Sequence, residues 1–220
     1  MQFLYHSKSG DASLVIDNEA FLHLRARRIK INDTLVLKNL KDSFAYYYKC
    51  IEISRRSCVL NLQDKKEEKQ ELKSYIHLAL AVIDPKIIEK TLPFLNELGV
   101  AKLSLVYMDY SQKNFKLDFQ RMEKILIESS QQCGRASLME LESFENFDKF
   151  GQKYNNIVLI DFEGDELTNF NPNKYVFLIG AEGGFSQKEK QKNIKKAKLH
   201  ANFILKAQTA LVGVASKFII

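Results

Sequence analysis

The sequence predicts an α/β protein with a small, strand-rich N-terminal part and a larger part built on a mostly parallel sheet. Residues 1–62 contain short runs of β-branched and aromatic residues bounded by Gly, Asn, Asp or Ser, which is the pattern of short strands. From residue 75 onward, apolar segments alternate with helix patterns. These segments lack polar alternation, as expected for strands buried on both faces of a parallel sheet.

A polar run separates the two parts. Gln63–Lys73 contains a single apolar side chain, Leu72. Such a run is typical of a linker or of a solvated helix face. We therefore predict two domains, residues 1–72 and residues 73–220.

Five strands and one helix are predicted in the N-terminal part. The helix spans Asn18–Leu24 with Asn18 as its N-cap, since Asn is favoured at that position. Many short strands with one helix indicate a small β-barrel. The predicted strands are Met1–His6, Ser13–Ile16, Thr34–Leu37, Phe44–Ile53 and Cys58–Leu62.

A basic cluster follows this helix and consists of Arg25, Arg27, Arg28 and Lys30. Cations that contact phosphates give affinity without sequence specificity, so the cluster is a candidate RNA contact. The chain has 33 Lys and Arg against 27 Asp and Glu, a formal net charge of +6. This charge hints at an anionic partner, of which nucleic acid is the commonest, and solubility alone is the alternative explanation.

Helix signals in the larger part are clearest at Asp84-Pro85, an N-cap followed by Pro, and at Gly99, which ends that helix after Leu98. Ser186 and Glu189 have the spacing of a capping box. Three further helices are predicted at Phe115–Gln132, Ser186–Lys198 and Thr209–Ile219. The predicted strands are Tyr75–Ile83, Ala101–Tyr107, Ile157–Asp161, Tyr175–Gly180 and Phe203–Leu205.

Composition excludes several classes of protein. The apolar stretches are far shorter than the roughly 20 residues that cross a bilayer, and the N-terminus lacks the pattern of a signal peptide. Three scattered cysteines indicate a reducing cytoplasm and not a disulfide framework. The four histidines are far apart, and no Cys/His cluster has metal-ligand spacing, so we expect no metal site.

A Gly-rich turn is the strongest candidate site. It reads Gly180-Ala181-Glu182-Gly183-Gly184 and joins an apolar strand to the capped helix. Glycines let the backbone bend and let a ligand approach the main chain, and ligands of parallel sheets bind beyond the carboxyl ends of strands. The turn is neither a Walker A loop nor a dinucleotide fingerprint, which argues against a dinucleotide-dependent oxidoreductase. A tight connection without a ligand remains the alternative.

Two other segments have weaker signals. The strand end Leu159–Glu166 is acidic and contains a Gly; it is a solvated loop or a place for a ligand's hydroxyls. The string Gln131-Gln132-Cys133-Gly134-Arg135 closes a helix, so Arg135 either complements the helix dipole or contacts a phosphate or base.

Four strings together resemble one family. They are GAEGGFS at 180–186, QQCGR at 131–135, NELGV at 96–100 and ILKAQTA at 204–210. Their order is that of the RsmE-type 16S ribosomal RNA uracil-N3 methyltransferases, which belong to the SPOUT, or α/β-knot, superfamily. His23 with Leu24, Arg28 and Asp33 also fall where that family's N-terminal barrel has its His, Arg and Gly-Asp pattern.

The resemblance implies a homodimer whose larger domain is a SPOUT trefoil knot with a mostly parallel sheet, preceded by a small PUA-like β-barrel. The implied cofactor is S-adenosyl-L-methionine, bound in the knot. The residues implied to hold it are Ile160, Asp161, Leu178, Ile179, Gly180, Glu182, Gly183, Gly184, Leu205, Gln208, Thr209 and Ala210.

The implied reaction is methyl transfer to uracil N3 of 16S ribosomal RNA in the small ribosomal subunit. Uracil N3 holds its proton at neutral pH, so a base or support for the anion is needed. The implied catalytic residues are Arg135 and Glu182, and their roles stay open. The residues implied to bind RNA are Arg25, Arg27, Arg28, Gln132, Arg135 and Lys206.

Two alternatives remain. Phe203, Lys206 and Gln208 stand where the family usually has Arg, Arg and Glu. A ribosome-binding or assembly factor that keeps the fold without catalysis would accommodate these departures. A SPOUT methyltransferase that acts on transfer RNA is the other alternative.

Overall fold

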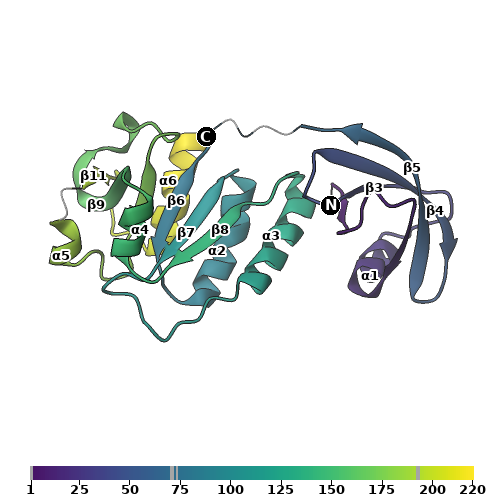
Figure 1. Cartoon of the computed structure of the whole chain (residues 1–220), viewed down its shortest axis with the longest axis horizontal. Coiled ribbons are helices and arrows are strands. Elements are labelled where there is room, and N and C mark those ends of the chain that lie inside the picture. The colour runs from purple at the N-terminus through teal and green to yellow at the C-terminus, as the bar shows by residue number, and fades with distance from the viewer. Residues whose placement is uncertain (1, 70–71, 73, 192–193) are drawn as a thin grey trace. The chain divides into compact units, whose positions relative to one another are not determined.

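The structure is a computed structural model that describes residues 2–69, 72, 74–191 and 194–220 (Figure 1). The chain divides into two compact units, Met1–Glu71 with Ile127–Leu138, and Leu72–Leu126 with Met139–Ile220. The division into domains at residue 72 stays a prediction. Residue 1 of the first predicted strand, residues 70, 71 and 73 of the polar run, and residues 192 and 193 of the predicted Lys-rich helix lie outside the described residues.

The first unit is built on a five-stranded mixed sheet with strand order β1-β3-β4-β5-β2. β1 pairs with β3 in parallel, and the other pairs are antiparallel. The sheet and helix α1 (Asn18–Ala26) enclose an apolar core that includes Phe21, Leu24 and Tyr48. Closure into a barrel stays a prediction. The strands are β1 Leu4–Tyr5, β2 Ser13–Asp17, β3 Thr34–Lys38, β4 Phe44–Ile53 and β5 Ser57–Glu67.

Two predictions for the first unit are wrong in detail. The N-cap of α1 is Asp17, because that residue ends β2 opposite Ser57 and already has the extended backbone of a cap. The polar run begins as a strand, since β5 continues to Glu67 and pairs there with Phe44. The ammonium groups of Lys65 and Lys66 lie 5.0 Å and 5.1 Å from the ring centroids of Phe44 and Tyr47 in β4.

The second unit contains a six-stranded sheet with order β11-β9-β10-β6-β7-β8. Every strand pair in it is parallel, which confirms the predicted α/β class. β6 and β10 are buried along their whole length, as their apolar sequences predict. The strands are β6 His77–Ala81, β7 Lys102–Val106, β8 Glu140–Phe144, β9 Ile157–Glu166, β10 Val176–Ile179 and β11 Lys195–Lys198.

The helices follow the sequence signals where a cap is present. The Asp84 side chain accepts a hydrogen bond from Lys86 N, and Gly99 ends that helix at φ +81°. The final helix packs against α2, β6 and β10. The helices are α2 Pro85–Glu97, α3 Phe119–Cys133, α4 Phe147–Lys153, α5 Gln187–Lys190 and α6 Ala207–Ile219, with a short 3₁₀ helix η1 at Leu167–Asn169.

Two predictions at the C-terminal end are wrong. The Lys-rich segment is not one helix: α5 has only four residues, and Lys195–Lys198 forms β11 beside β9. Gly164 permits this pairing, because a Cβ there would lie 2.5 Å from the Lys196 carbonyl. Phe203–Leu205 is irregular and not a strand; Phe203 is 84% exposed, so its apolar character does not reflect burial.

The remaining differences concern the ends of predicted elements and two elements that were not predicted. β9 runs five residues beyond its predicted end, and α6 begins at Ala207 instead of Thr209. β8 and α4 were not predicted. β8 is an edge strand that is only partly buried, so its sequence mixes acidic and apolar residues and lacks the continuous apolar run of the inner strands. Among the described helices, none is long and apolar enough to cross a membrane.

Candidate active site

The Gly-rich turn follows β10 directly and is closed by its own backbone. Gly184 N donates a hydrogen bond of 2.8 Å to Ala181 O, and these two residues form an isolated antiparallel bridge. Gly184 has φ +70°, which favours glycine. A Cβ on Gly180 would lie 2.9 Å from the Gly184 carbonyl carbon and oxygen. Both glycines are therefore required by the geometry of the turn.

A cavity of about 470 Å³ lies at this turn, beyond the end of β10. Its volume is in the range of small-molecule sites, and its place agrees with the general position of ligands in parallel sheets. Three separate segments form its wall: residues 160–162 in the middle of β9, the end of β10 with the Gly-rich turn and α5, and residues within 199–210. The lining residues are Ile160, Asp161, Phe162, Ile179, Gly180, Ala181, Glu182, Gly183, Gly184, Phe185, Lys190, Leu199, Ala201, Phe203, Ile204, Leu205, Ala207 and Ala210.

Three charged side chains line the cavity. Asp161 Oδ2 forms an ion pair with Lys190 Nζ at 2.8 Å, and the Asp161 side chain is only 7% exposed. Its Oδ1 also accepts a hydrogen bond from Phe162 N. Glu182 is exposed and makes no hydrogen bond or ion pair within the described part of the chain. The cavity thus combines an apolar wall with one neutralised and one free carboxylate, an arrangement that suits a ligand with a cationic group.

Comparisons with known proteins decide the family. The family model for RNA methyltransferase domains matches residues 70–219. A relative from Helicobacter pylori strain J99, named Ribosomal RNA small subunit methyltransferase E, is 42% identical and aligns over 98% of each chain.

The chain belongs to the ribosomal RNA small subunit methyltransferase E family. The resemblance predicted from the sequence strings is thereby confirmed. A protein of the same name from Aquifex aeolicus is 25% identical over 97% of each chain.

Solved structures share the fold. A methyltransferase from Legionella pneumophila, in complex with S-adenosylmethionine, has a TM-score of 0.82 at 21% identity and covers 99% of this chain. That alignment includes 96% of the Legionella chain. Ribosomal RNA small subunit methyltransferase E from Neisseria gonorrhoeae, bound to S-adenosyl methionine, has a TM-score of 0.78 at 18% identity, with 99% and 96% coverage. The fold of this family member is therefore that of the solved structures across both units.

Most residues predicted to hold the cofactor line this one cavity. Leu178 does not, because side chains alternate along a strand and Ile179 takes the cavity side. Gln208 and Thr209 lie in the first turn of α6 outside the lining. The predicted residues that do line it are Ile160, Asp161, Ile179, Gly180, Glu182, Gly183, Gly184, Leu205 and Ala210.

Sequence reasoning missed two kinds of lining residue. Lys190 reaches Asp161 from α5, 29 positions away in sequence, so no local pattern predicts the pair. Phe162, Phe203 and Ile204 are 75%, 84% and 81% exposed. Large apolar residues that stay exposed are a signal of binding, but exposure is not visible in the sequence.

Arg135 belongs to the first unit and is 5% exposed. Burial lowers the pKa of its guanidinium to about 10, so it stays charged at neutral pH. Its Nε donates to Ser137 Oγ at 3.4 Å. The neighbouring Gln131 accepts hydrogen bonds from Gln2 N and Tyr5 N, both at 2.7 Å. The end of α3 thus holds the N-terminal strand. The catalytic role of Arg135 stays a prediction, as does that of Glu182 in the second unit.

The residues predicted to bind RNA are otherwise exposed. Arg25, Arg27 and Arg28 lie at the end of α1, where Arg28 adopts φ +59° just after the helix. Gln132 is exposed near the end of α3, and Lys206 is the exposed N-cap of α6. Their accessibility permits phosphate contacts, and their role in RNA binding stays a prediction.

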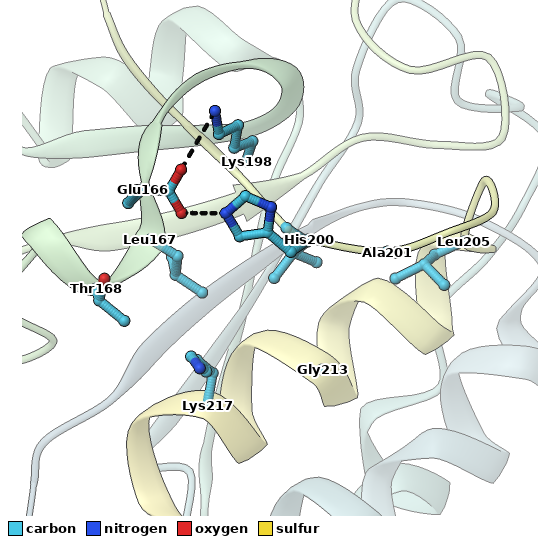
Figure 2. Close-up of a pocket in the computed structure, with 10 residues that line it drawn as sticks. Glu166, Leu167, Thr168, Lys198, His200, Ala201, Leu205, Gly213 and Lys217 are labelled. Carbon is cyan, nitrogen blue, oxygen red and sulfur yellow. Dashed lines mark hydrogen bonds and ion pairs between the residues drawn. The ribbon is translucent and has the colours of Figure 1, made fainter.

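A second cavity of about 330 Å³ shares Leu199, Ala201 and Leu205 with the first. Figure 2 shows Glu166 between His200 and Lys198, the two partners that lower the pKa of its carboxyl. The cavity's remaining charge is Lys217 of α6. None of the predicted catalytic residues lines this cavity, so the first cavity is the candidate active site.

The described residues contain no candidate metal site. No group of three or more His, Cys, Asp or Glu side chains there is arranged to hold a metal ion.

Proposed function

We propose that this chain transfers the methyl group of S-adenosylmethionine to uracil N3 of 16S ribosomal RNA. The observation that carries the proposal is the cavity, where three segments far apart in the sequence meet. They are the same three segments that the family resemblance assigns to the cofactor. The printed name of the relatives, Ribosomal RNA small subunit methyltransferase E, supports the substrate class.

The cavity fits the cofactor chemically. S-adenosylmethionine supplies an electrophilic methyl group on a positively charged sulfur. The apolar side chains of Ile160, Ile179 and Leu205 suit its adenine ring, and the close backbone of Gly180 and Gly184 leaves main-chain groups available to bind it. The free carboxylate of Glu182 suits its cationic groups, and the ion-paired carboxylate of Asp161 suits its ribose hydroxyls.

Glu182 is the group that we assign to the proton of uracil N3. Its carboxylate is exposed at the cavity and has no partner within the described residues, so it is available to accept a proton. For Arg135 of the first unit we keep the role that the family resemblance implies, which is to stabilise the uracil anion or to hold a phosphate.

The wider architecture belongs to the same proposal. A trefoil knot would explain why residues 160–162, 180–185 and 199–210 line one cavity. We further propose a homodimer in the cytoplasm, with the first unit as a PUA-like barrel whose Arg25, Arg27 and Arg28 dock the RNA. The small ribosomal subunit is the proposed partner.

The test is methyl transfer from labelled S-adenosylmethionine to small ribosomal subunits from a strain that lacks this protein. We expect new 3-methyluridine by nucleoside mass spectrometry. Label that enters transfer RNA instead would support the alternative substrate. Cofactor binding without any transfer would favour the non-catalytic factor, for which the departures at Phe203, Lys206 and Gln208 are the specific reason.

Asp161→Asn should weaken the affinity for S-adenosylmethionine by about 10- to 100-fold, because hydrogen bonds to charged groups contribute about 1.5–3 kcal/mol. Asp161 is the buried carboxylate of the cavity, and its amide analogue also loses the ion pair with Lys190. Titration calorimetry measures the affinity. Asp165→Asn, an exposed carboxylate on the same strand, is the matched control. Equal affinities for the two variants would remove Asp161 from the site.

A further inference from the structure

Five aromatic side chains of the second unit are strongly exposed: Tyr75, Phe94, Tyr110, Phe162 and Phe203. Three of them gather at the candidate active site. Phe162 and Phe203 line the cavity itself. Tyr110 is not part of the lining, but it lies against the Gly-rich turn.

Tyr110 lies directly beside Gly183. A Cβ on Gly183 would lie 3.0 Å from Tyr110 Cδ2 and 3.4 Å from Cγ, so the ring occupies the space next to this glycine. Gly183 also lines the cavity, and its neighbour Glu182 is the free carboxylate. Tyr110 is 53% exposed, so part of its surface is open to a ligand.

The loop that carries Tyr110 is fixed by a buried carboxylate. Glu189 of α5 is 3% exposed. Its Oε1 accepts a hydrogen bond from Asp109 N at 2.9 Å, and its Oε2 accepts one from Ser186 N at 2.8 Å. Ser186 Oγ donates to Asp109 Oδ2 at 2.5 Å. These bonds join the residue before Tyr110 to the segment after the Gly-rich turn, across 77 to 80 positions of sequence.

We infer that Tyr110 is the stacking platform for the target base, and that Glu189 is the residue that positions it. Bases of single-stranded RNA stack on aromatic side chains, and a loop whose backbone is fixed beforehand loses less entropy on binding. A base on Tyr110 lies beside the turn, next to Glu182. Phe162 and Phe203 line the space assigned to the cofactor instead. This inference rests on the proposed function, since it names the substrate contact of the same site.

The test compares Tyr110→Leu with Tyr110→Phe and with Tyr75→Leu, a change at a tyrosine that is 49% exposed in the same unit. The first readout is the affinity for unmethylated small ribosomal subunits in the presence of S-adenosylmethionine. The second is the affinity for S-adenosylmethionine alone, by calorimetry. We expect Tyr110→Leu to weaken subunit binding by about 5- to 100-fold with unchanged cofactor affinity, as stacking of one base predicts. Tyr110→Phe and Tyr75→Leu should bind as the wild type does.

A double-mutant cycle tests the positioning role. Glu189→Gln should weaken subunit binding, and adding Tyr110→Leu to it should cause less further loss than Tyr110→Leu causes alone. A purely structural effect of Glu189 would leave the two losses additive and would overturn that role.

The outcomes separate this inference from the proposed function. If the wild-type chain transfers no methyl group but Tyr110→Leu still weakens subunit binding, the platform stands and the catalytic proposal fails. If Tyr110→Leu binds subunits as well as Tyr75→Leu, or loses cofactor affinity to the same extent as subunit affinity, the platform is overturned.

Discussion

Gly180→Ala is expected to reduce the affinity for S-adenosylmethionine by about 10- to 100-fold, because overpacking of a tight site costs about 1–3 kcal/mol. The new methyl group would lie 2.9 Å from the Gly184 carbonyl carbon and oxygen and 3.0 Å from Gly184 Cα. These are backbone atoms of the same turn, so the strain cannot be relieved by rotating a side chain. The hydrogen bond from Gly184 N to Ala181 O must lengthen, and the cavity changes shape.

Gly183→Ala gives a graded comparison at the same turn. The three atoms nearest to its Cβ all belong to the Tyr110 side chain, the closest at 3.0 Å. That side chain is half exposed and can move, so cofactor affinity should fall less than in Gly180→Ala. A larger loss of cofactor affinity in Gly180→Ala than in Gly183→Ala would show that backbone strain, and not the replacement of a glycine as such, causes the loss.

Gly151→Ala is the control for folding. Gly151 lies in α4, and a Cβ there meets no atom within 4 Å beyond the backbone of its own helix. Alanine is a better helix former than glycine, so this variant should be as stable as the wild type or more stable by up to about 1 kcal/mol. Calorimetry on all three variants, after circular dichroism confirms their fold, completes the measurement. Wild-type cofactor affinity in Gly180→Ala would exclude the turn from the binding site.

The features that were predicted correctly from the sequence are those that a few adjacent residues determine. The Asp84 cap, the Gly99 end and the Ser186–Glu189 capping box are all formed as their spacing indicates. The Gly-rich turn follows its strand where predicted. In each case the residues within one or two turns of the feature determine the local structure that forms.

The errors occurred where distant pairing overrides local preference. The sequence Lys195–Lys198 favours a helix by propensity, yet it forms a strand because β9 lies beside it and Gly164 allows close approach. The first five residues of the polar run become the end of β5 for the same reason, since β4 extends beside them. Lys190 and Tyr110 reach the site through contacts that no local pattern encodes.

A buried polar network across β6, β7 and β8 makes the second unit sensitive to acid. His77 Nε2 lies 2.7 Å from Ser104 Oγ, and Ser104 Oγ donates to Glu142 Oε1 at 2.6 Å. Because the serine proton points at Glu142, the Nε2 of His77 donates to Ser104 Oγ, and in the neutral ring this is the Nε2–H tautomer. Tyr154 and Lys153 also donate to Glu142, and Lys102 Nζ forms an ion pair with its Oε2 at 3.4 Å.

Burial is the main cause that lowers the pKa of His77 from 6.5 to about 4, and the charge of Lys102 adds to it. The unfolded chain therefore takes up a proton below pH 6.5 that the folded chain accepts only near pH 4. The free energy of unfolding should fall as the pH drops through this window, by about 3 kcal/mol in all. Glu142, whose pKa is lowered to about 2 by its hydrogen bonds, adds a further loss only below pH 4.5. The two groups thus act in successive pH ranges.

Urea unfolding followed by circular dichroism at pH 7.5, 6.0 and 4.8 measures this loss in a chain that contains no Trp. His77→Gln keeps an amide donor for Ser104 and removes the titrating ring, so its unfolding free energy should change much less over that range. His23→Gln, at an exposed histidine of α1, should keep the wild-type slope. Burial also lowers the pKa of His6, so this residue gives the wild type and both variants a slope of the same sign.

The imidazole proton resonances give the direct check, because they report each histidine separately. The His77 signal should not titrate above pH 5, and its assignment follows from its absence in His77→Gln. A His77 signal that titrates near pH 6.5 would mean that the ring is solvated in the folded chain. The hydrogen bonds to Ser104 and Glu142 would then not form as the structure places them, and the acid sensitivity of the second unit would need another source.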